Sequence, residues 1–379
     1  MAGRKRRVGG DRLGLGVFAL VLAGLCLLLS WLSLPGRTST AEPTTPPPGS
    51  ARSPRPPSPD PSAPNAPIAH ANDTLRVHFY DVSQGLAALV DLPGGRRILV
   101  DTGDSPARER CGTDCATAHR HLLAALSHDL AGGPIDLLWI THQHSDHIGG
   151  ARDVLGQFVV KHYVDNGRDA NKAEVSRTHD AARARGTPVD YVSPSHPWSA
   201  PLAAAVAGPA RLTPIVPVAW PSDCATDPNE CSLALRIDFG DSSVLFTGDA
   251  ERGEERALPV DAKVTLLQVA HHGSETSSGE AFLARVAPRY AVISAGHPSS
   301  GMNSDYCLPR SSTLEKLNQA LGGGKEKTLL GFEGKSTCRR SHGAGWVAVP
   351  VNERLWATER DGDVVLSTHG DGVFQREGP

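Results

Sequence analysis

The sequence lacks the excess of basic residues that is typical of proteins that bind duplex DNA tightly. The chain of 379 residues carries a formal charge of −3, and residues 72–379 hold 30 Lys and Arg against 38 Asp and Glu, a charge of −8. Because duplex binding rests on several phosphate contacts from Lys and Arg, we expect no tight duplex binding. Cleavage of a phosphodiester remains compatible with this charge, since bound metal ions can neutralise the scissile phosphate.

Charge is absent from the 22-residue run Leu13–Leu34, which is long enough to cross a hydrocarbon core of ~30 Å as a helix. Five basic residues within the first 12 positions precede it, which predicts a cytoplasmic N-terminus and an extracytoplasmic remainder, periplasmic or on the cell surface. We expect residues 1–34 to be an uncleaved transmembrane signal-anchor in the cytoplasmic membrane. A cleaved signal peptide is the alternative, but its apolar run usually spans only about 7–15 residues.

Residues 35–71 contain few large apolar side chains and are dominated by Pro, Ser, Ala and Thr. Such a segment has little surface to bury, so we expect an extended, disordered linker. Internal repeats at the periods of solenoid proteins are absent. Residues 72–379 therefore form one expected α/β domain, in which the part from Gly345 is interpreted as a C-terminal extension of short strands.

Cysteine is absent from the His- and Asp-rich motifs described below. Beyond Cys26, which lies in the uncharged run, six cysteines remain, and an even number suits an oxidising compartment. Short polar loops favour local pairing of four of them, which leaves one further pair, although a small structural zinc site is an alternative. The expected disulfides are Cys111–Cys115, Cys224–Cys231 and Cys307–Cys338.

Metal-ligand side chains are concentrated directly after the apolar run Ile135–Ile140. A strand that ends in a tight turn can direct His142 and His144 at one ion, while Asp146 and His147, at the start of the next helix, reach a second ion. A polar loop with three surface histidines is the alternative, which the His-x-His-x-Asp-His spacing disfavours. The segment predicts a two-metal hydrolase site.

Two further strand ends complete this pattern. A hairpin is expected over residues 232–247, and it ends at Asp249, whose two oxygens can bridge two cations. The apolar run Val264–Ala270 delivers His271 and His272 at its end. Because adjacent residues of a strand point to opposite sides, we expect His271 to bind metal and His272 to face the substrate as a catalytic group.

These segments resemble the metallo-β-lactamase superfamily and, within it, the hydrolase domain of the competence-type DNA-uptake channel family. The matching stretches are Tyr80–Gly85, Ile98–Gly103, His142–Gly150, Phe246–Asp249 and Ala270–Ser274. The resemblance implies a four-layer αββα sandwich with the metals at one edge of its two sheets.

The chain departs from the competence-type pattern at two places. Leu86 follows Gly85 where that family usually has an Asp, and Leu308 stands where it tends to have a His before a Pro. His297, which precedes Pro298, is a candidate replacement. No stretch resembles the family's channel-forming membrane domain, so the resemblance does not extend to DNA transport.

Three residues complete the candidate site. Asp101, at the end of an apolar run, is the expected carboxylate that orients a ligating imidazole, and Asp81 is a weaker candidate for the same role. A turn Asp is the alternative for both. His196, in a turn-like Ser-His-Pro, is the best placed of several candidates for an extra ligand, and a surface histidine is its alternative.

These observations predict a membrane-anchored, extracytoplasmic, binuclear metal-dependent hydrolase. Water on such ions has its pKa lowered towards ~7, which supplies hydroxide at neutral pH, and Asp146 would also orient this nucleophile. Zinc is the expected metal and manganese the alternative. The expected ligands are His142 and His144 for the first ion, Asp146, His147 and His271 for the second, and Asp249 between the two.

The expected substrate is a phosphodiester, in single-stranded nucleic acid or in another extracytoplasmic phosphate polymer, because two cations can clamp the attacking and leaving oxygens. A degenerate metal-binding or structural module is an alternative motivated by Leu86 and Leu308. A lactonase or β-lactamase is a third, against which Asp249 stands where many zinc β-lactamases have Cys.

Overall fold

The computed structural model describes residues 73–169, 172–199, 202, 208–334 and 344–378. The expected anchor, residues 1–34, and the expected linker, residues 35–71, lie outside the described residues. Within the described part, no helix is both long enough and apolar enough to cross a membrane.

An eight-stranded sheet has the order β16-β15-β1-β2-β3-β4-β5-β6. Its strands from β16 to β3 pair antiparallel, whereas β3 to β6 run parallel and are joined through helices, as parallel neighbours require. The strands are β1 Leu75–Phe79, β2 Ala88–Asp91, β3 Arg97–Val100, β4 Leu137–Trp139, β5 Tyr163–Asp165, β6 Val189–Tyr191, β15 Val364–Thr368 and β16 Gln375–Glu377.

A six-stranded sheet has the order β14-β11-β10-β9-β8-β7. The expected hairpin is confirmed, since β8 and β9 pair antiparallel about Gly240 and Asp241, while β9, β10, β11 and β14 run parallel. The strands are β7 Arg211–Ile215, β8 Ala234–Phe239, β9 Ser242–Phe246, β10 Leu266–Gln268, β11 Tyr290–Ile293 and β14 Leu355–Ala357.

Helices cover the outer face of each sheet. Apolar side chains of α1, α3 and α4 pack on the eight-stranded sheet, and those of α7 and α9 pack on the six-stranded sheet beside the hairpin β12–β13. The remaining short helices lie in loops. The elements are α1 Asp114–Leu130, α2 Ser145–Ile148, α3 Ala151–Gln157, α4 Lys172–Ala184, α6 Arg252–Ala257, α7 Glu280–Val286, α8 Asn303–Tyr306, α9 Ser311–Ala320, α10 Thr358–Asp361, η1 Ser222–Ala225, η2 Pro228–Cys231, η3 Ala270–Gly273, β12 Lys327–Phe332 and β13 Trp346–Val351.

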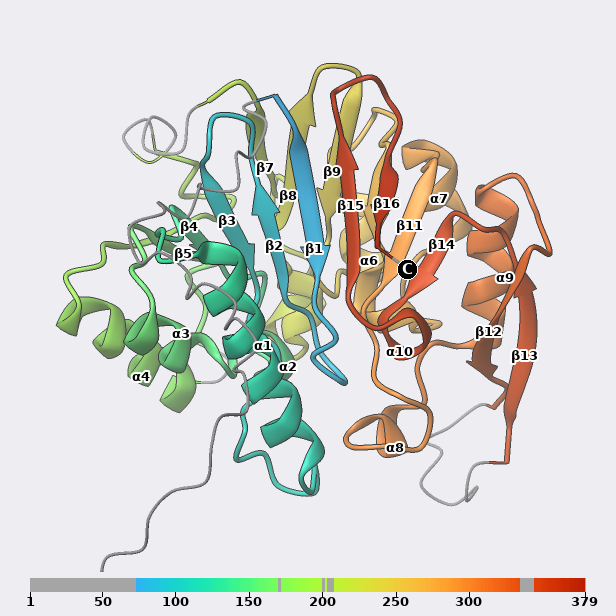
Figure 1. The fold of residues 1–379 in the computed structure, drawn as a ribbon, viewed down its shortest axis with the longest axis horizontal. Coiled ribbons are helices and arrows are strands. Elements are labelled where there is room, and N and C mark those ends of the chain that lie inside the picture. The colour runs from blue at the N-terminus through green and yellow to red at the C-terminus, as the bar shows by residue number, and fades with distance from the viewer. Residues whose placement is uncertain (1–72, 170–171, 200–201, 203–207, 335–343, 379) are drawn as a thin grey trace, which may run out of the picture. The chain divides into compact units, whose positions relative to one another are not determined.

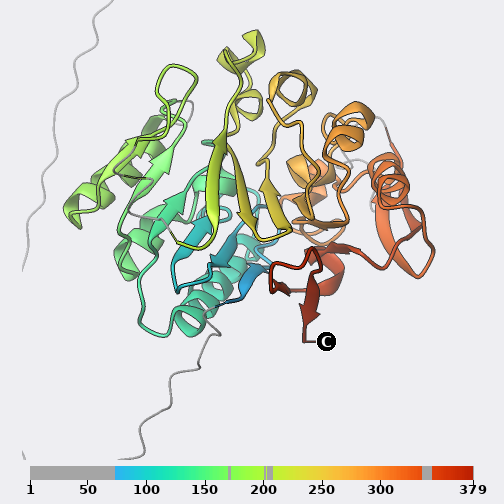
Figure 2. The same cartoon turned by 90° about the horizontal axis from the view of Figure 1, so that it is seen from above.

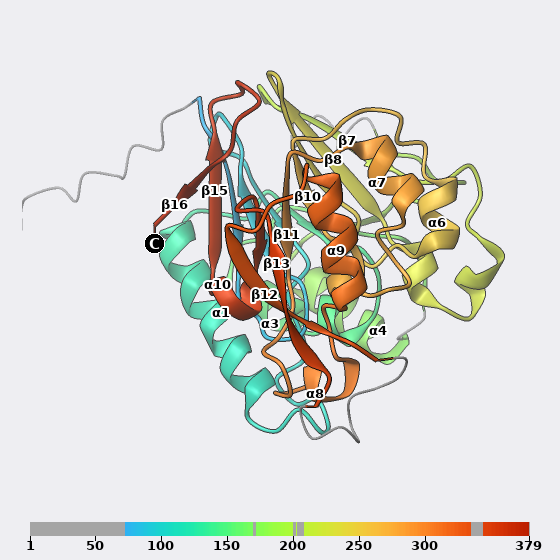
Figure 3. The ribbon, with the colours of Figure 1, turned by 90° about the vertical axis from the view of Figure 1, so that its right-hand side faces the viewer.

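The two sheets face each other across one apolar layer that includes Phe79, Trp139, Leu235 and Phe246. Trp139 is fully buried there, and its Nε1 donates a hydrogen bond to the carbonyl oxygen of Leu233 in the other sheet's half, at 3.0 Å. Figure 3 shows the layers side by side, with α1 outside one sheet and α9 outside the other, and Figure 2 shows the two sets of strands from above. The expected αββα sandwich is confirmed.

The C-terminal part is integral to the sandwich rather than an extension of it. β14 completes the edge of the six-stranded sheet beside β11, and β15 pairs with β1 so that Leu75 faces Thr368. Figure 1 shows the red β15 next to the blue β1. Short strands look independent in sequence, but β14 and β15 supply backbone hydrogen bonds to β11 and β1, whose edges they cover.

Two of the three expected disulfides are present, Cys111–Cys115 and Cys224–Cys231. Cys307 is also disulfide-bonded, and Cys338, its expected partner, lies outside the described residues. The local pairs therefore follow the prediction made from the short intervening loops.

Candidate metal centre

Four strand ends converge at one edge of the sandwich. β3 and β4 are parallel, as are β9 and β10, so the segments that follow them emerge at the same edge. These segments carry Asp101, the His142–His147 motif, Asp249 and the His271–His272 pair. Residues far apart in sequence are thereby brought within contact distance.

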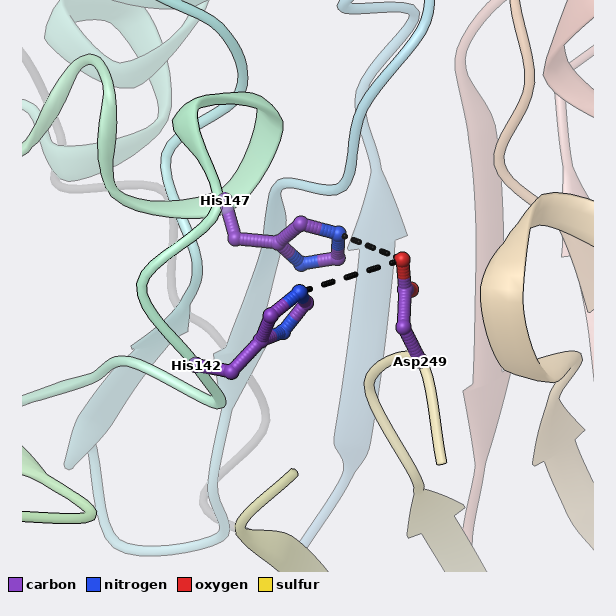
Figure 4. Close-up of side chains that lie close together, drawn as sticks. All are labelled: His142, His147 and Asp249. Carbon is purple, nitrogen blue, oxygen red and sulfur yellow. Dashed lines mark ion pairs between the residues drawn. The ribbon is translucent and has the colours of Figure 1, made fainter. Parts of the chain in front are cut away.

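A first group of ligand atoms belongs to His142, His147 and Asp249, all of which are buried and lie within 4.8 Å of one another. Figure 4 shows both imidazoles pointing at the Asp249 carboxylate. Oδ2 of Asp249 lies 3.2 Å from Nε2 of His147 and 3.9 Å from Nε2 of His142. His144 adjoins this group, since its Nδ1 lies 3.1 Å from Nε2 of His142.

A second group consists of Asp146, His147 and His272. Nε2 of His272 lies 3.6 Å from Oδ2 of Asp146 and 3.4 Å from Oδ2 of Asp249. The two groups share His147, whose Nε2 lies 3.3 Å from Nε2 of His272. Asp249 therefore belongs to the first group and also contacts His272 of the second, as a carboxylate shared by two ions would.

The order expected for the last two histidines is reversed. His272 is buried within the cluster, whereas the side chain of His271 is 22 % exposed and lies at its margin. The expectation assumed an extended strand end, but both residues have positive φ, 50° and 52°, so the alternation of a strand does not apply. Nε2 of His271 lies 3.9 Å from Oδ2 of Asp249, while its Nδ1 lies 3.1 Å from Oε1 of Glu251.

Hydrogen bonds at the far side of two rings determine which ring nitrogen faces the cluster. Nδ1 of His272 lies 2.7 Å from the carbonyl oxygen of Ser294, which only accepts, so Nδ1 carries the hydrogen and Nε2 presents its lone pair. Nδ1 of His147 lies 2.7 Å from Oδ2 of Asp101. Each ring is therefore held in the orientation that a metal ligand needs.

Asp101 has the role expected for it in orienting an imidazole. Besides His147, it accepts hydrogen bonds from the backbone N and the Oγ1 of Thr141, both at 2.8 Å. Burial disfavours a charged His147, but the charges of Asp249 and Asp101 outweigh it and raise the pKa of His147 well above its ordinary value. Through these hydrogen bonds, Asp101 connects the end of β3 to the His142–His147 motif that follows β4.

Asp249 is presented by a tight turn. Gly248 has φ of 54°, and a Cβ there would lie 2.7 Å from Cβ of Thr141, so a larger residue would push the turn away from the motif. The backbone N of Asp249 donates to Oγ of Ser232 at 3.0 Å. Burial alone would raise the pKa of Asp249, but the surrounding histidines, His147 foremost, lower it well below its ordinary value.

The donor set fits a divalent metal ion. Imidazole nitrogens and carboxylate oxygens are the ligands that zinc takes, and manganese accepts them as well. Oδ1 of Asp249 is buried and has no hydrogen-bond partner in the described part of the chain. A buried carboxylate oxygen without a partner is costly unless an ion neutralises it, so the residues match the group that the motif predicts.

Three sequence candidates lie outside the cluster. Asp81 accepts a hydrogen bond from the backbone N of Ser83, the local turn that was its alternative interpretation. His196 is exposed and its ring stacks on Tyr191 at a centroid distance of 4.1 Å. His297 is exposed as well. None of the three belongs to either group of ligand atoms among the described residues.

The polar residues around Asp146 belong to no motif in the sequence. Asp104 accepts a hydrogen bond from Oγ of Ser145, and NH1 of Arg108 lies 3.9 Å from Oδ1 of Asp146. NH2 of Arg108 donates to the hydroxyl of Tyr306, which is 198 positions away. No spacing in the sequence signals such contacts, because they join separate loops.

Comparisons with known proteins agree with this geometry. The family model described as the metallo-beta-lactamase superfamily matches residues 80–297. The chain is 31% identical over 251 residues to Recombination protein 2 of Haemophilus influenzae, covering 65% of this chain and 27% of that protein. It is 30% identical over 258 residues to ComE operon protein 3 of Bacillus subtilis, covering 64% and 30%. The chain thus spans less than a third of the length of these two relatives.

Among solved structures, the chain is similar to the metallo-beta-lactamase fold protein YhfI of Bacillus subtilis. The identity is 16%, the TM-score is 0.41, and the match covers 66% of this chain and 94% of that one.

Proposed function

The chain belongs to the metallo-beta-lactamase superfamily, and on this premise we propose that it is a binuclear phosphodiesterase that acts outside the cytoplasm. Metal-dependent hydrolysis follows from membership of the superfamily, and the resemblance to competence proteins agrees with the prediction made from the motifs. The use of two ions, the phosphodiester substrate and the membrane anchor are the proposed parts.

One observation carries the proposal of two ions: two groups of ligand atoms overlap at His147, and Oδ2 of Asp249, a member of the first group, also lies 3.4 Å from Nε2 of His272 in the second. His142 and His144 with Asp249 would hold one ion, and Asp146, His147 and His272 with Asp249 would hold the other. When bound, such ions acidify a water molecule and neutralise charge on a phosphoryl group.

The protein's own residues hold this arrangement in place. Asp101 and the carbonyl of Ser294 fix the rings of His147 and His272, and the turn at Gly248 directs Asp249 between them. Because the cluster is buried, its charges act in a region from which most water is excluded, where electrostatic interactions are stronger.

His271 takes the substrate-facing position that the sequence analysis assigned to His272. It lies at the exposed margin of the cluster, and Glu251 holds its Nδ1, while Nε2 remains directed towards Asp249. Thr276 donates to the same oxygen of Glu251 at 2.8 Å, which fixes the carboxylate. A histidine fixed in this way can hydrogen-bond a substrate that approaches the ions.

The preference for a phosphodiester over a lactone or β-lactam has two supports. Asp249 supplies a hard carboxylate oxygen to the ligand cluster. Two ions, when bound there, would stabilise the attacking and the leaving oxygen of a phosphodiester in an in-line displacement. Two of the relatives that match are named for recombination and for competence. The disulfides support a location outside the cytoplasm, because such bonds persist in oxidising compartments.

The test combines metal analysis with a substrate panel. The full-length chain in detergent, loaded with Zn²⁺ or Mn²⁺, would be assayed against bis-p-nitrophenyl phosphate, single-stranded DNA, a lactone and a cephalosporin. We expect about two ions per chain and cleavage of the two phosphodiesters, with both lost in Asp249→Ala and retained in His196→Ala. Hydrolysis of only the lactone or the cephalosporin would refute the substrate class, and one ion per chain or fewer would refute the binuclear site.

A further inference from the structure

Arg108 occupies the rim of the metal centre on the side of Asp146. Its loop leaves β3 and reaches α1, and its guanidinium lies between Asp104, Asp146 and Tyr306. NH1 lies 3.0 Å from Oδ2 of Asp104 and 3.9 Å from Oδ1 of Asp146. The Arg108 side chain is 22 % exposed and that of Asp104 is 1 % exposed. A buried carboxylate therefore holds the guanidinium, while part of the Arg108 side chain remains in contact with solvent.

The guanidinium retains donors for a further partner. It has five N–H groups, and the described residues accept hydrogen bonds from NH1 and NH2 only, through Asp104 and Tyr306. The planar fork of Arg suits two oxygens of one phosphate or carboxylate. Because Asp146 would coordinate an ion in the loaded enzyme, its negative charge would not repel an incoming anion.

Tyr306 extends this donor set. Its hydroxyl accepts a hydrogen bond from NH2 of Arg108 at 2.6 Å, so the oxygen is held while its own hydrogen can be donated elsewhere. Tyr306 ends α8, at the lower end of the sandwich in Figures 1 and 3. A hydroxyl and a guanidinium from two separate loops therefore meet next to one predicted metal ligand.

The two loops are fixed to each other at several points, so the pair is pre-oriented. Buried Cys111, Cys115 and Met302 form one apolar cluster against which the Tyr306 ring packs, and the two cysteines are bonded to each other. Further along, Oγ of Ser300 donates to Asp114 at 2.5 Å. Donors held in place before binding lose little entropy when a ligand arrives.

We propose that Arg108 and Tyr306 form an anion subsite that binds a non-bridging oxygen of the substrate phosphate beside Asp146. The identity of the anion as a phosphodiester rests on the proposed function. The subsite itself rests on the geometry of the two side chains, and it makes the enzyme selective for a substrate that keeps a negative charge next to the scissile bond.

The test measures binding as well as turnover. The full-length, metal-loaded chain would be titrated with dimethyl phosphate, the simplest phosphodiester anion, by calorimetry. We expect Arg108→Gln to weaken binding by ~10–100-fold, because a charged donor is lost, and Tyr306→Phe by ~3–10-fold, because its donor is neutral. Arg108→Lys should restore only part of the loss, because a Lys lacks the fork.

Arg110 supplies a matched control in the same loop. Its side chain is 60 % exposed and its Nη1 pairs with Asp305 at 3.4 Å, and it contacts none of the predicted ligands among the described residues. Arg110→Gln should therefore leave dimethyl phosphate binding and metal content unchanged. Tyr306→Phe retains the ring that packs on the disulfide, so it tests the hydroxyl without loosening the loops.

The outcomes separate this proposal from the proposed function. If the wild type hydrolyses phosphodiesters but Arg108→Gln binds dimethyl phosphate as tightly as the wild type, the subsite is refuted and the function stands. If the wild type binds dimethyl phosphate through Arg108 but hydrolyses only neutral substrates, the function is refuted and the subsite stands. Loss of metal from Arg108→Gln would also refute the subsite, since Arg108 would then act by positioning Asp146.

Discussion

Replacing Asp101 by Asn is expected to weaken the metal centre without touching a ligand. In the wild type, Oδ2 of Asp101 lies 2.7 Å from Nδ1 of His147 and accepts from Oγ1 of Thr141 at 2.8 Å, while Oδ1 accepts from the Thr141 backbone N. An Asn has the same shape but only one acceptor oxygen. If that oxygen keeps the backbone bond, the amide NH₂ group faces Nδ1 of His147 and cannot accept from it.

The consequence for His147 is a change of tautomer. Nδ1 of His147 becomes the acceptor, so the ring hydrogen moves to Nε2. Nε2 is the atom that faces Asp249 and His272, and its lone pair is then no longer free to bind an ion. Loss of such a supporting contact typically lowers metal affinity by ~10–100-fold, or about 1.4–2.8 kcal/mol. The free energy of unfolding of the metal-free protein should also fall by roughly 1.5–3 kcal/mol, because the lost hydrogen bonds involve a buried charge.

Competition calorimetry with a chelator of known affinity measures the first quantity, and urea unfolding measures the second. Asp81→Asn is the matched control, since Asp81 was the weaker candidate for the same role but, within the described part of the chain, accepts only the local bond from Ser83. The reasoning fails if Asp101→Asn binds metal like the wild type, or if Asp81→Asn weakens binding to the same extent.

Three further predictions concern the two adjacent histidines, a buried histidine outside the centre and one disulfide. His272→Ala should lose bound metal, whereas His271→Ala should keep it and lose turnover, as elemental analysis and assay would show; equal metal loss in both would contradict the assignment. The ring of His78, in β1, lies 2.7 Å from Asp129 and 3.1 Å from Asp363. Burial disfavours a charged His78, but these two carboxylates outweigh burial and raise its pKa. Its contribution to stability is therefore full below pH ~6.5 and lost as the pH rises through the folded pKa, and His78→Gln should flatten this fall in urea unfolding. Removing the disulfide with Cys111→Ser and Cys115→Ser should cost about 2 kcal/mol for so short a loop and weaken dimethyl phosphate binding at unchanged metal content.

Much of the metal centre could be predicted because its parts are local in sequence. The motif from His142 to His147 and the turn at Asp249 each follow an apolar strand, and the ends of parallel strands meet at one edge of a sheet. The alternation of side chains in a strand fails at His271 and His272, where the backbone turns left-handed to let His272 enter the cluster. Backbone geometry of this kind has no signature in the residue types.

Contacts between distant loops could not be predicted. Arg108 and Tyr306 are 198 positions apart, and neither belongs to a pattern of metal ligands. His196 illustrates the opposite error, since a suitable residue type in a suitable turn stacks on Tyr191 instead of reaching the centre. A single sequence contains the chemistry of each side chain, but the pairing of loops depends on how the whole sandwich packs.

The pairing of β15 with β1 has a consequence for the synthesis of the protein. Leu75 and Thr368 are neighbours in the sheet, and β14, only a few residues before β15, completes the other sheet. Neither sheet is complete until the ribosome has made nearly the whole domain. Until then, β1 and β11 each lack the neighbouring strand on one side. Such long-range pairing slows folding and prolongs the time in which a chaperone or a translocation machine can hold the chain unfolded.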